Sequence, residues 1–331
     1  MKRFTSDKGN SRMYLRQRCR QLLTLLDALG DNLANLDLQK LLFLYCQEVF
    51  ATGREDTATS LYEFVPYRYG AFSFTCYADR RRLVDHGLLI DDDQHWVLTA
   101  EGKCIARETQ DCSMHAFARR YRGLRGQALI AEAYRRYPYY AIHSDIAERV
   151  LQNDKVALNK IRNAQPERND GSLFTIGYEG RTLESYLNVM LQSGVTLLCD
   201  VRRNAVSRKY GFSKCTLAKA CAGVDIHYQH LPELGIESRL RRDLETQADL
   251  DNLFRVYERK ILPTQSEALN KIRAWLQSGE CVALTCYERK SVQCHRHCVA
   301  VELGRLSDHA VLFDQPAGLH SDEQVYTAKH L

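Results

Sequence analysis

The sequence has no long apolar run, no strong excess of one charge and no apolar stretch among its first residues. None of its apolar stretches approaches the roughly 20 residues that a transmembrane helix needs. The opening residues, MKRFTSDKGNSRMYLRQRCR, carry positive charges without an apolar stretch after them, which is not the pattern of a secretory signal. We therefore expect a protein of the cytoplasm that makes no contact with a membrane.

Cysteine is abundant, but the patterns of a disulfide framework and of a structural zinc site are lacking. Several of the 12 cysteines, including Cys46, Cys199 and Cys281, lie inside apolar runs, where cysteine behaves as a small buried hydrophobe. Disulfides are rare in a reducing compartment. Paired C-x-x-C spacings are absent as well. We therefore expect no disulfides, no metal and no other cofactor.

The chain is long enough for two domains with separate cores. It has 331 residues and a formal net charge of +5, which permits binding to nucleic acid without requiring it. The expected segments are a winged helix-turn-helix-like domain at 1–104, a helical connector at 105–165, an α/β catalytic domain at 166–315 and a tail at 316–331.

The N-terminal part shows helical patterns followed by a hairpin pattern. Residues 12–30 have apolar side chains at helical spacing, with Gly30 as the expected end, and a second helix is predicted from Asp37. Two short apolar runs, 88–90 and 95–99, flank an acidic turn and predict a hairpin. Helices followed by such a hairpin are typical of a winged helix.

Four motifs in residues 35–104, KLLFLYCQ, YRYGAFSF, LVDHGLL and WVLTAEGK, resemble the Panacea-type domain of bacterial antitoxin-like proteins. The corresponding function is contact with DNA, with Arg68, Arg80, Arg81 or Arg82 on phosphates. The alternative is a protein-interaction or dimerisation module. Three adjacent arginines on one helix cannot all face the same groove, which weakens the simplest docking geometry.

Short apolar runs at 173–176, 195–199, 225–231 and 281–286 predict buried strands. A helical pattern that begins at Leu183 separates the first two, which is the βαβ order of a parallel sheet. We predict an α/β fold: a Rossmann-like, mostly parallel sheet with helices on both faces, preceded by the mostly helical winged-helix-like domain.

Polar and charged residues follow the ends of these strands. Ligands of open α/β sheets bind outside the carboxyl ends of the strands. We call this edge of the sheet, at the carboxyl ends of its strands, the rim. The residues expected there are Tyr178, Glu179, Asp200, Arg202, Arg203, Cys286, Glu288, Cys294, His295 and Arg296.

Four motifs in this part, TIGYEG, LLCDVRRNAVSRKYGFSK, IHYQHLPELG and ALTCYERKSVQCHR, resemble the bacterial domain-of-unknown-function family 488 over residues 172–305. The resemblance implies an α/β fold whose site contains an Asp-Val-Arg segment and a Cys-His-Arg segment. Asn204-Ala205 stands where the family usually has a proline after the arginines, a departure that concerns the conformation of this loop rather than the site.

Four residues are candidates for the chemical step: Tyr178, Glu179, Asp200 and Glu288. A carboxylate at Asp200 can activate water or stabilise an oxocarbenium ion. The alternative is a structural ion pair with Arg202 or Arg296. Glu179 and Glu288 are possible second carboxylates or helix caps, and Tyr178 can stack on a base or be a core aromatic.

The segment Cys294-His295-Arg296 is expected at a helix start, where it suits a phosphate. A nucleophilic Cys294 thiolate is the alternative, and a metal ranks below both. The other expected substrate contacts are Arg202, Arg203, Ser207, Arg208, Lys209, Tyr228, His230 and Cys286.

These residue types favour an enzyme that acts on nucleic acid, with DNA as the expected partner. The most concrete hypothesis is an N-glycosylase that removes a modified base, with Asp200 or Glu288 activating water. In a bacterium, such an enzyme would suit defence against foreign DNA. Two alternatives stay open: a DNA-binding regulator whose α/β domain senses a nucleotide or small anion, and a thiol enzyme built on Cys294.

Overall fold

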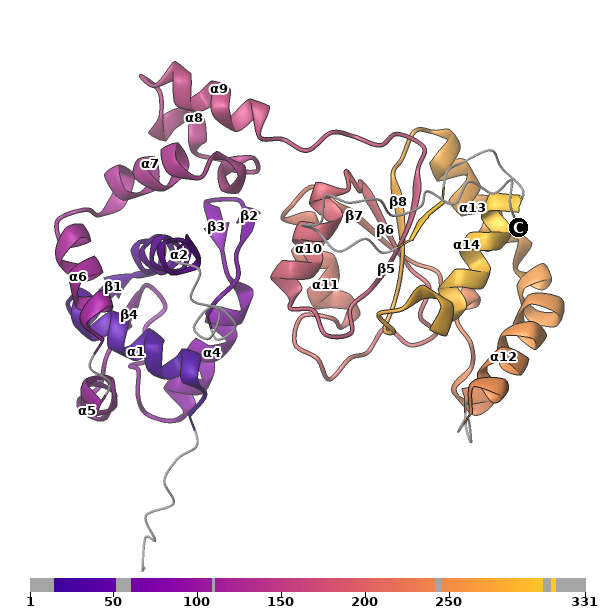
Figure 1. Ribbon diagram of the computed structural model, residues 1–331, viewed down its shortest axis with the longest axis horizontal. Helices are drawn as coiled ribbons and strands as arrows, with labels where there is room; N and C mark the ends of the chain where they lie inside the picture. The colour runs from indigo at the N-terminus through magenta and orange to yellow at the C-terminus, as the bar shows by residue number, and fades with distance from the viewer. Residues whose placement is uncertain (1–14, 52–60, 109–110, 242–245, 306–310, 314–331) are drawn as a thin grey trace, which may run out of the picture. The chain divides into compact units, whose positions relative to one another are not determined.

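A computed structural model of the chain describes residues 15–51, 61–108, 111–241, 246–305 and 311–313 (Figure 1). Among them, residues up to Tyr62 together with Cys76–Leu129 form one compact unit, the N-terminal unit; Glu63–Thr75 and the residues from Ile130 onward form another, the C-terminal unit. This division differs from the expected boundaries at 104 and 165, because residues 63–75 and much of the expected connector group with the α/β region. The expected tail lies outside the described residues.

The N-terminal unit is mostly helical. Its elements, in chain order, are α1 (Gln17–Leu29), β1 (Asn32–Ala34), α2 (Asn35–Ala51), α4 (Phe74–Asp85), β4 (His95–Val97), α5 (Ala100–Glu108), α6 (Cys112–Tyr121) and the start of α7 (Gly126–Arg136). The first two expected helices are confirmed. α1 ends at Gly30, whose φ of 117° lies in the left-handed region that favours glycine.

The expected hairpin after α4 is also confirmed. The amide of Ile90 donates to the carbonyl of Val97 at 2.9 Å, and Leu89 bridges Leu98 in antiparallel fashion. β1 pairs antiparallel with β4 and adds a third extended segment. Trp96 is fully buried at the centre of this arrangement. The unit is therefore winged-helix-like.

The C-terminal unit includes a hairpin that comes from the middle of the N-terminal sequence. β2 (Val65–Tyr67) pairs with β3 (Gly70–Phe72). The buried carboxylate of Glu184, on α10 (Leu183–Gln192), accepts hydrogen bonds from Ser73 and Thr75. Three short helices then lead to the sheet: η1 (Pro138–Ala141), α8 (Ala147–Val150) and α9 (Lys155–Asn163).

A five-stranded parallel sheet forms the centre of this unit. Its strands are β5 (Leu173–Gly177), β6 (Leu197–Asp200), β7 (His227–His230), β8 (Val282–Cys286) and β9 (Val311–Phe313). Their order across the sheet is β7-β6-β8-β5-β9, and all neighbours are parallel. The four expected strands and the βαβ order are confirmed.

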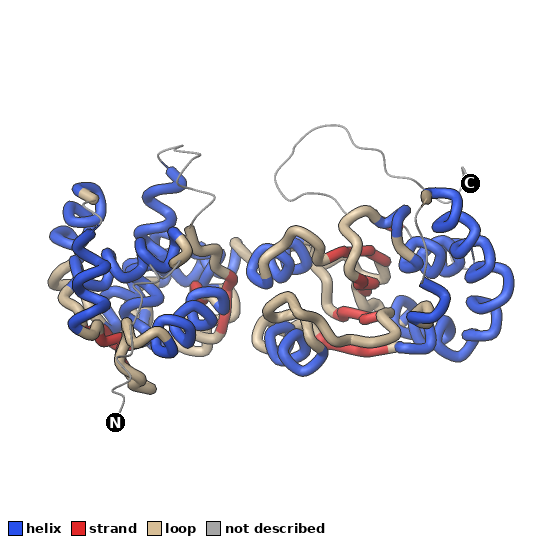
Figure 2. Tube along the Cα trace, turned by 90° about the horizontal axis from the view of Figure 1, so that it is seen from below, coloured by secondary structure: helices blue, strands red, loops and turns tan. Residues whose placement is uncertain are grey.

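Helices cover both faces of the sheet, as Figures 1 and 2 show. α10 and α11 (Lys214–Ala222) pack on one face through Leu187 and Leu217. The other face is covered by α13 (Ser266–Gln277) and α14 (His295–Arg305), whose buried residues include Ile272 and Val299. The remaining elements are η2 (Pro232–Leu234), η3 (Ser238–Arg241), α12 (Gln247–Val256), η4 (Tyr257–Ile261), η5 (Leu262–Gln265) and η6 (Ser291–Gln293). The expected Rossmann-like α/β fold is confirmed.

No helix in the described ranges combines the length and the apolar character needed to cross a membrane.

Candidate functional site at the carboxyl edge of the sheet

The strand register brings the expected rim residues together. Gly177 at the end of β5 lies opposite Cys286 at the end of β8, and Asp200 at the end of β6 lies opposite Thr285 and His230. The segments that follow these strands therefore share one edge of the sheet, as predicted.

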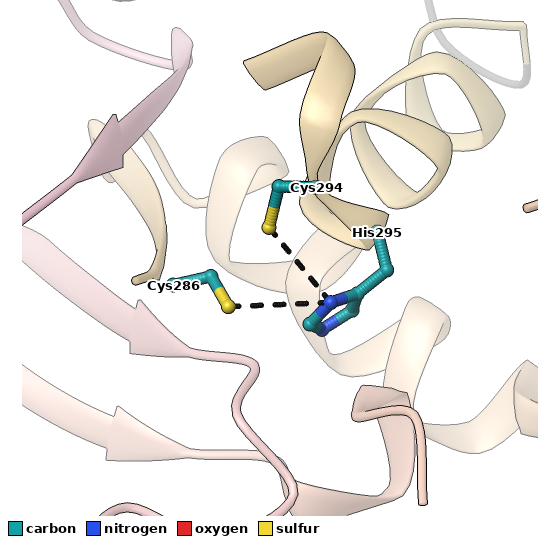
Figure 3. A group of neighbouring side chains, drawn as sticks. All are labelled: Cys286, Cys294 and His295. Atoms are coloured by element: carbon teal, nitrogen blue, oxygen red, sulfur yellow. Dashed lines mark hydrogen bonds between the residues drawn. The ribbon is translucent and has the colours of Figure 1, made fainter. Parts of the chain in front are cut away.

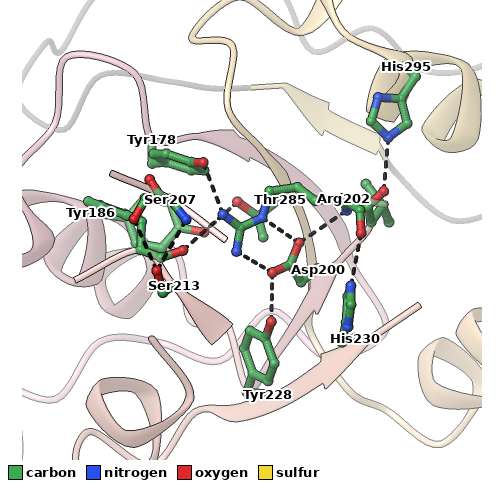
Figure 4. A network of polar contacts seen from close by, with 12 residues as sticks. Tyr178, Tyr186, Asp200, Arg202, Ser207, Ser213, Tyr228, His230, Thr285 and His295 are labelled. Atoms are coloured by element: carbon green, nitrogen blue, oxygen red, sulfur yellow. Dashed lines mark hydrogen bonds and ion pairs between the residues drawn. The ribbon is translucent and has the colours of Figure 1, made fainter. Parts of the chain in front are cut away.

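Asp200 forms a buried ion pair with Arg202 (Figure 4). The Arg202 backbone amide and Nε donate to Oδ1 of Asp200 at 3.1 and 2.8 Å, and a terminal guanidinium nitrogen donates to Oδ2 at 2.5 Å. The Tyr228 hydroxyl also donates to Oδ2, at 2.6 Å. Asp200 is 0% exposed, so its carboxylate has four protein donors and no solvent contact. This is the structural ion pair that the sequence left open as an alternative.

The charges of this pair shape the pKa values around it. Burial alone would lower the pKa of Arg202, but the hydrogen bonds and the charge of Asp200 raise it above its ordinary value. Burial, reinforced by the charge of Asp200, raises the pKa of Tyr228. Both groups therefore keep their protons at neutral pH and act as donors.

Arg202 also contacts the aromatic side chains at the rim, Tyr178 and its neighbour Phe212. It donates to the Tyr178 hydroxyl and to the carbonyl of Phe212, both at 2.9 Å, and lies 5.1 Å from the Tyr178 ring centre. Tyr178 stacks on Phe212 with centroids 4.4 Å apart and is buried. The Tyr178 ring is therefore a core aromatic with a paired hydroxyl rather than an open stacking surface. Its edge contact with the exposed ring of Tyr287 extends this group of aromatic side chains outward.

The loop after β6 presents cations to solvent. Ser207 and Ser213 hold it closed: the Ser207 amide donates to Oγ of Ser213, and this hydroxyl donates to the Ser207 carbonyl. Arg203 and Arg208 are exposed, and half-buried Lys209 donates to the carbonyl of Tyr178 at 2.7 Å. Of the phosphate-binding side chains expected in this loop, Arg203 and Arg208 are thus exposed, Ser207 and Lys209 are half-buried, and Arg202 is buried.

The loop between β8 and α14 is held by internal contacts. Arg296, 0% exposed, donates to the carbonyls of Glu288 and Arg289 at 2.5 and 3.0 Å. The carboxylate of Glu179 accepts from the amide of Arg289 at 3.0 Å. Arg296 therefore fixes the loop from inside, which differs from its expected role on a phosphate, whereas Glu288 is half-buried at the rim.

Three of the expected phosphate or thiol residues form a buried cluster behind this loop (Figure 3). Cys286, Cys294 and His295 are 2%, 1% and 0% exposed, and their sulfur and nitrogen atoms lie within 4.8 Å of one another. Their burial places them below the surface that a phosphate would reach. Burial also raises the pKa of Cys294 well above its ordinary value, the opposite of what an exposed nucleophilic thiolate requires.

Half-buried His230 completes the edge near β7. Its Nε2 lies 2.9 Å from the carbonyl of Arg202, close to the Tyr228–Asp200 contact. Both Tyr228 and His230 thus border the rim, as predicted, with their polar tips turned to the Asp200–Arg202 segment.

The four arginines expected on DNA belong to two units. Arg80 donates to the carbonyls of Asp92 and His95 and lies over the ring of Trp96, so it closes the turn of the hairpin. Arg82 pairs with the buried carboxylate of Asp79. Arg81 is exposed on α4, and Arg68 is exposed on the β2–β3 turn in the C-terminal unit.

Sequence reasoning missed several residues that build the site. Phe212 and Ser213 shape the loop after β6, and the buried hydroxyl of Tyr186 donates to Thr285 at 2.7 Å. These residues lie inside or beside the recognised motifs, but Phe212 and Tyr186 have partners in distant segments, Tyr178 after β5 and Thr285 on β8. Sequence spacing alone does not identify such pairs.

Among known protein families, one matches the chain, and the match lies within the C-terminal unit. Residues 182–303 match the family described as "Domain of unknown function DUF488". No curated protein and no solved structure matched the chain. The resemblance of residues 35–104 to Panacea-type domains rests on the sequence motifs alone. The match covers β6, β7 and β8 with the loops that follow them, but it begins after β5 and Tyr178. This part of the α/β region is accordingly similar to the DUF488 family.

Proposed function

We propose that the C-terminal unit is an enzyme that acts on nucleic acid, most concretely an N-glycosylase that removes a modified base from DNA. The observation that carries this proposal is the composition of the rim. Exposed cations and exposed aromatic rings lie on the loops after β6 and β8, and the second of these loops also carries Glu288, a half-buried residue.

The cations suit the phosphate backbone. Arg203 and Arg208 are exposed on the loop after β6, and Arg289 is exposed on the loop after β8. Side chains of this kind position a nucleic acid without reading its sequence, and their contribution falls as salt rises.

The exposed aromatic rings suit an unpaired base. Tyr210 and Tyr287 are 44% and 47% exposed on the same two loops. Stacking of a base on such a ring contributes about 1–3 kcal/mol and tolerates different bases. A base that has left its duplex could therefore be held at this rim.

Glu288 is the carboxylate best suited to the chemical step. Asp200 accepts four hydrogen bonds inside the protein, so it is assigned to positioning Arg202. In the proposed reaction the Glu288 carboxylate takes a proton from water. The water oxygen forms a bond to C1′ of the sugar as the bond from C1′ to the base nitrogen breaks. The base leaves with the electron pair of that bond and takes up a proton from solvent water, and Glu288 releases its proton to solvent.

The test is incubation of the full-length protein with DNAs that carry unmodified or modified bases, followed by mild alkali. Abasic sites appear as strand breaks, so breaks on one class of DNA establish base release and name the substrate class. Glu267→Gln changes an exposed carboxylate on α13 and is the matched control for Glu288→Gln. This control should keep full activity. If no DNA in the panel showed strand breaks, the result would contradict the proposed base release.

A second candidate rests on the N-terminal unit. Its helices and three-segment wing suit a DNA-binding regulator, whose α/β unit would sense a nucleotide or small anion. This candidate predicts a protected operator sequence and tight binding without strand breaks.

A further inference from the structure

The cluster of Cys286, Cys294 and His295 joins two elements of the C-terminal unit. Cys286 ends β8, Cys294 immediately precedes α14 and His295 is its first residue. The sulfurs of Cys286 and Cys294 lie 4.0 and 3.8 Å from Nδ1 of His295. Figure 3 shows both sulfur atoms directed at the same nitrogen.

The ring of His295 is oriented by a contact on its other side. Its Nε2 lies 3.0 Å from the carbonyl oxygen of Val201. A carbonyl only accepts, so Nε2 carries the proton, and in the neutral ring Nδ1 then has a lone pair directed at the two sulfurs. Histidines that bind metals commonly donate their second ring N–H to a backbone carbonyl in this way.

We propose that Cys286, Cys294 and His295 bind a thiophilic divalent cation such as Zn²⁺. Tetrahedral zinc with bonds of about 2.3 Å to sulfur and about 2.0 Å to nitrogen holds these atoms about 3.6 Å apart. The observed sulfur-to-nitrogen distances are a few tenths of an ångström longer, so small side-chain movements close the site. Two coordinated thiolates neutralise the charge of the cation within the buried cluster.

The sequence does not show the usual ligand spacing of a zinc site here, because the ligands come from two separate elements. The seven residues between Cys286 and Cys294 form the loop that carries Glu288, so a bound cation would tie both ends of this loop together. Within the described ranges, the group contains three protein ligands. Three ligands plus a water or other group is the pattern of catalytic rather than structural zinc sites.

The inference does not depend on the proposed function, because it is tested by metal binding alone. Metal-depleted full-length protein, kept reduced by a thiol-free reductant, is titrated with Zn²⁺ against a chromophoric chelator. We expect one tight equivalent. Titration with Co²⁺ should produce visible bands of tetrahedral cobalt and a near-ultraviolet thiolate-to-metal band.

Variants assign the ligands. Cys286→Ser, Cys294→Ser and His295→Gln should each weaken Zn²⁺ binding by more than the roughly 10- to 100-fold cost of losing a supporting hydrogen bond. Cys298→Ser, one turn along α14 and outside the cluster, is the matched control and should keep wild-type affinity. Absence of tight Zn²⁺ binding and of the cobalt–thiolate band in the folded wild type would overturn the inference, as would equal loss in Cys298→Ser.

Discussion

Asp200 and Arg202 show how one buried pair organises the surface above it. Arg202 contacts Asp200, Tyr178 and the carbonyl of Phe212 at once, so the rim aromatics depend on its position. The carboxylate is needed because an unpaired guanidinium at this depth would be very costly. We therefore treat Asp200 as a positioning residue.

Asp200→Asn tests this role at the residue scale. The substitution leaves Arg202 charged and buried without its counter-ion, so the free energy of unfolding should fall by about 3–5 kcal/mol. Urea unfolding of the purified protein measures the change. Arg203→Gln, at an exposed neighbour, should change it by less than about 0.5 kcal/mol. A variant that kept wild-type stability but lost base release would instead make Asp200 a chemical group.

At the scale of elements, β5 and the loop after β8 touch through backbone atoms. A Cβ at Gly177 would lie 1.9 Å from the carbonyl oxygen of Glu288, so this position needs a residue without a side chain. The same loop is held from the other side by Arg296. The position of Glu288 therefore follows from the packing of β5, β8 and α14.

Gly177→Ala should displace the loop. We expect a loss of about 1–3 kcal/mol in the free energy of unfolding, typical of overpacking, together with slower base release. Thermal unfolding and the abasic-site assay measure the two effects. Gly123→Ala, at a site with no atom within 4 Å of the added Cβ, is the control. Unchanged stability and rate in Gly177→Ala would show that the loop position is not set here.

The elements themselves could be predicted well from the sequence, but the site only in part. The strands at 173–176 and 281–286 were recognisable because each is a short apolar run ended by charge. The burial of Arg296 and His295 could not be predicted from the sequence, because the orientation of α14 against the sheet decides which side of its first turn faces inward. The partner of Asp200 was narrowed to two arginines, and packing selected Arg202.

At the scale of the whole molecule, sequence order and structural grouping differ. Residues 63–75 leave the N-terminal unit to pack on α10, where Ser73 and Thr75 share the carboxylate of Glu184. Contiguous segments were expected because no composition change marks this excursion. The hydrogen bonds of Ser73 and Thr75 to Glu184 form only in the folded protein, so the sequence does not reveal them.

Glu184→Ala should release this hairpin. Loss of the acceptor leaves buried donors unsatisfied, so the free energy of unfolding should fall by about 1–3 kcal/mol. Hydrogen exchange of residues 63–75 should also become faster. Glu148→Ala, on an exposed position of α8, should have neither effect. Unchanged exchange in Glu184→Ala would mean that other contacts hold the hairpin.

The most direct measurement for the whole account compares DNA affinity and base release in Glu288→Gln. Glutamine keeps the size of the side chain but cannot accept the proton from water. The account predicts wild-type affinity for the substrate DNA and a rate of base release lower by about 10²- to 10⁴-fold. Base release at the wild-type rate in this variant would contradict the assignment of the rim as a glycosylase site built on Glu288.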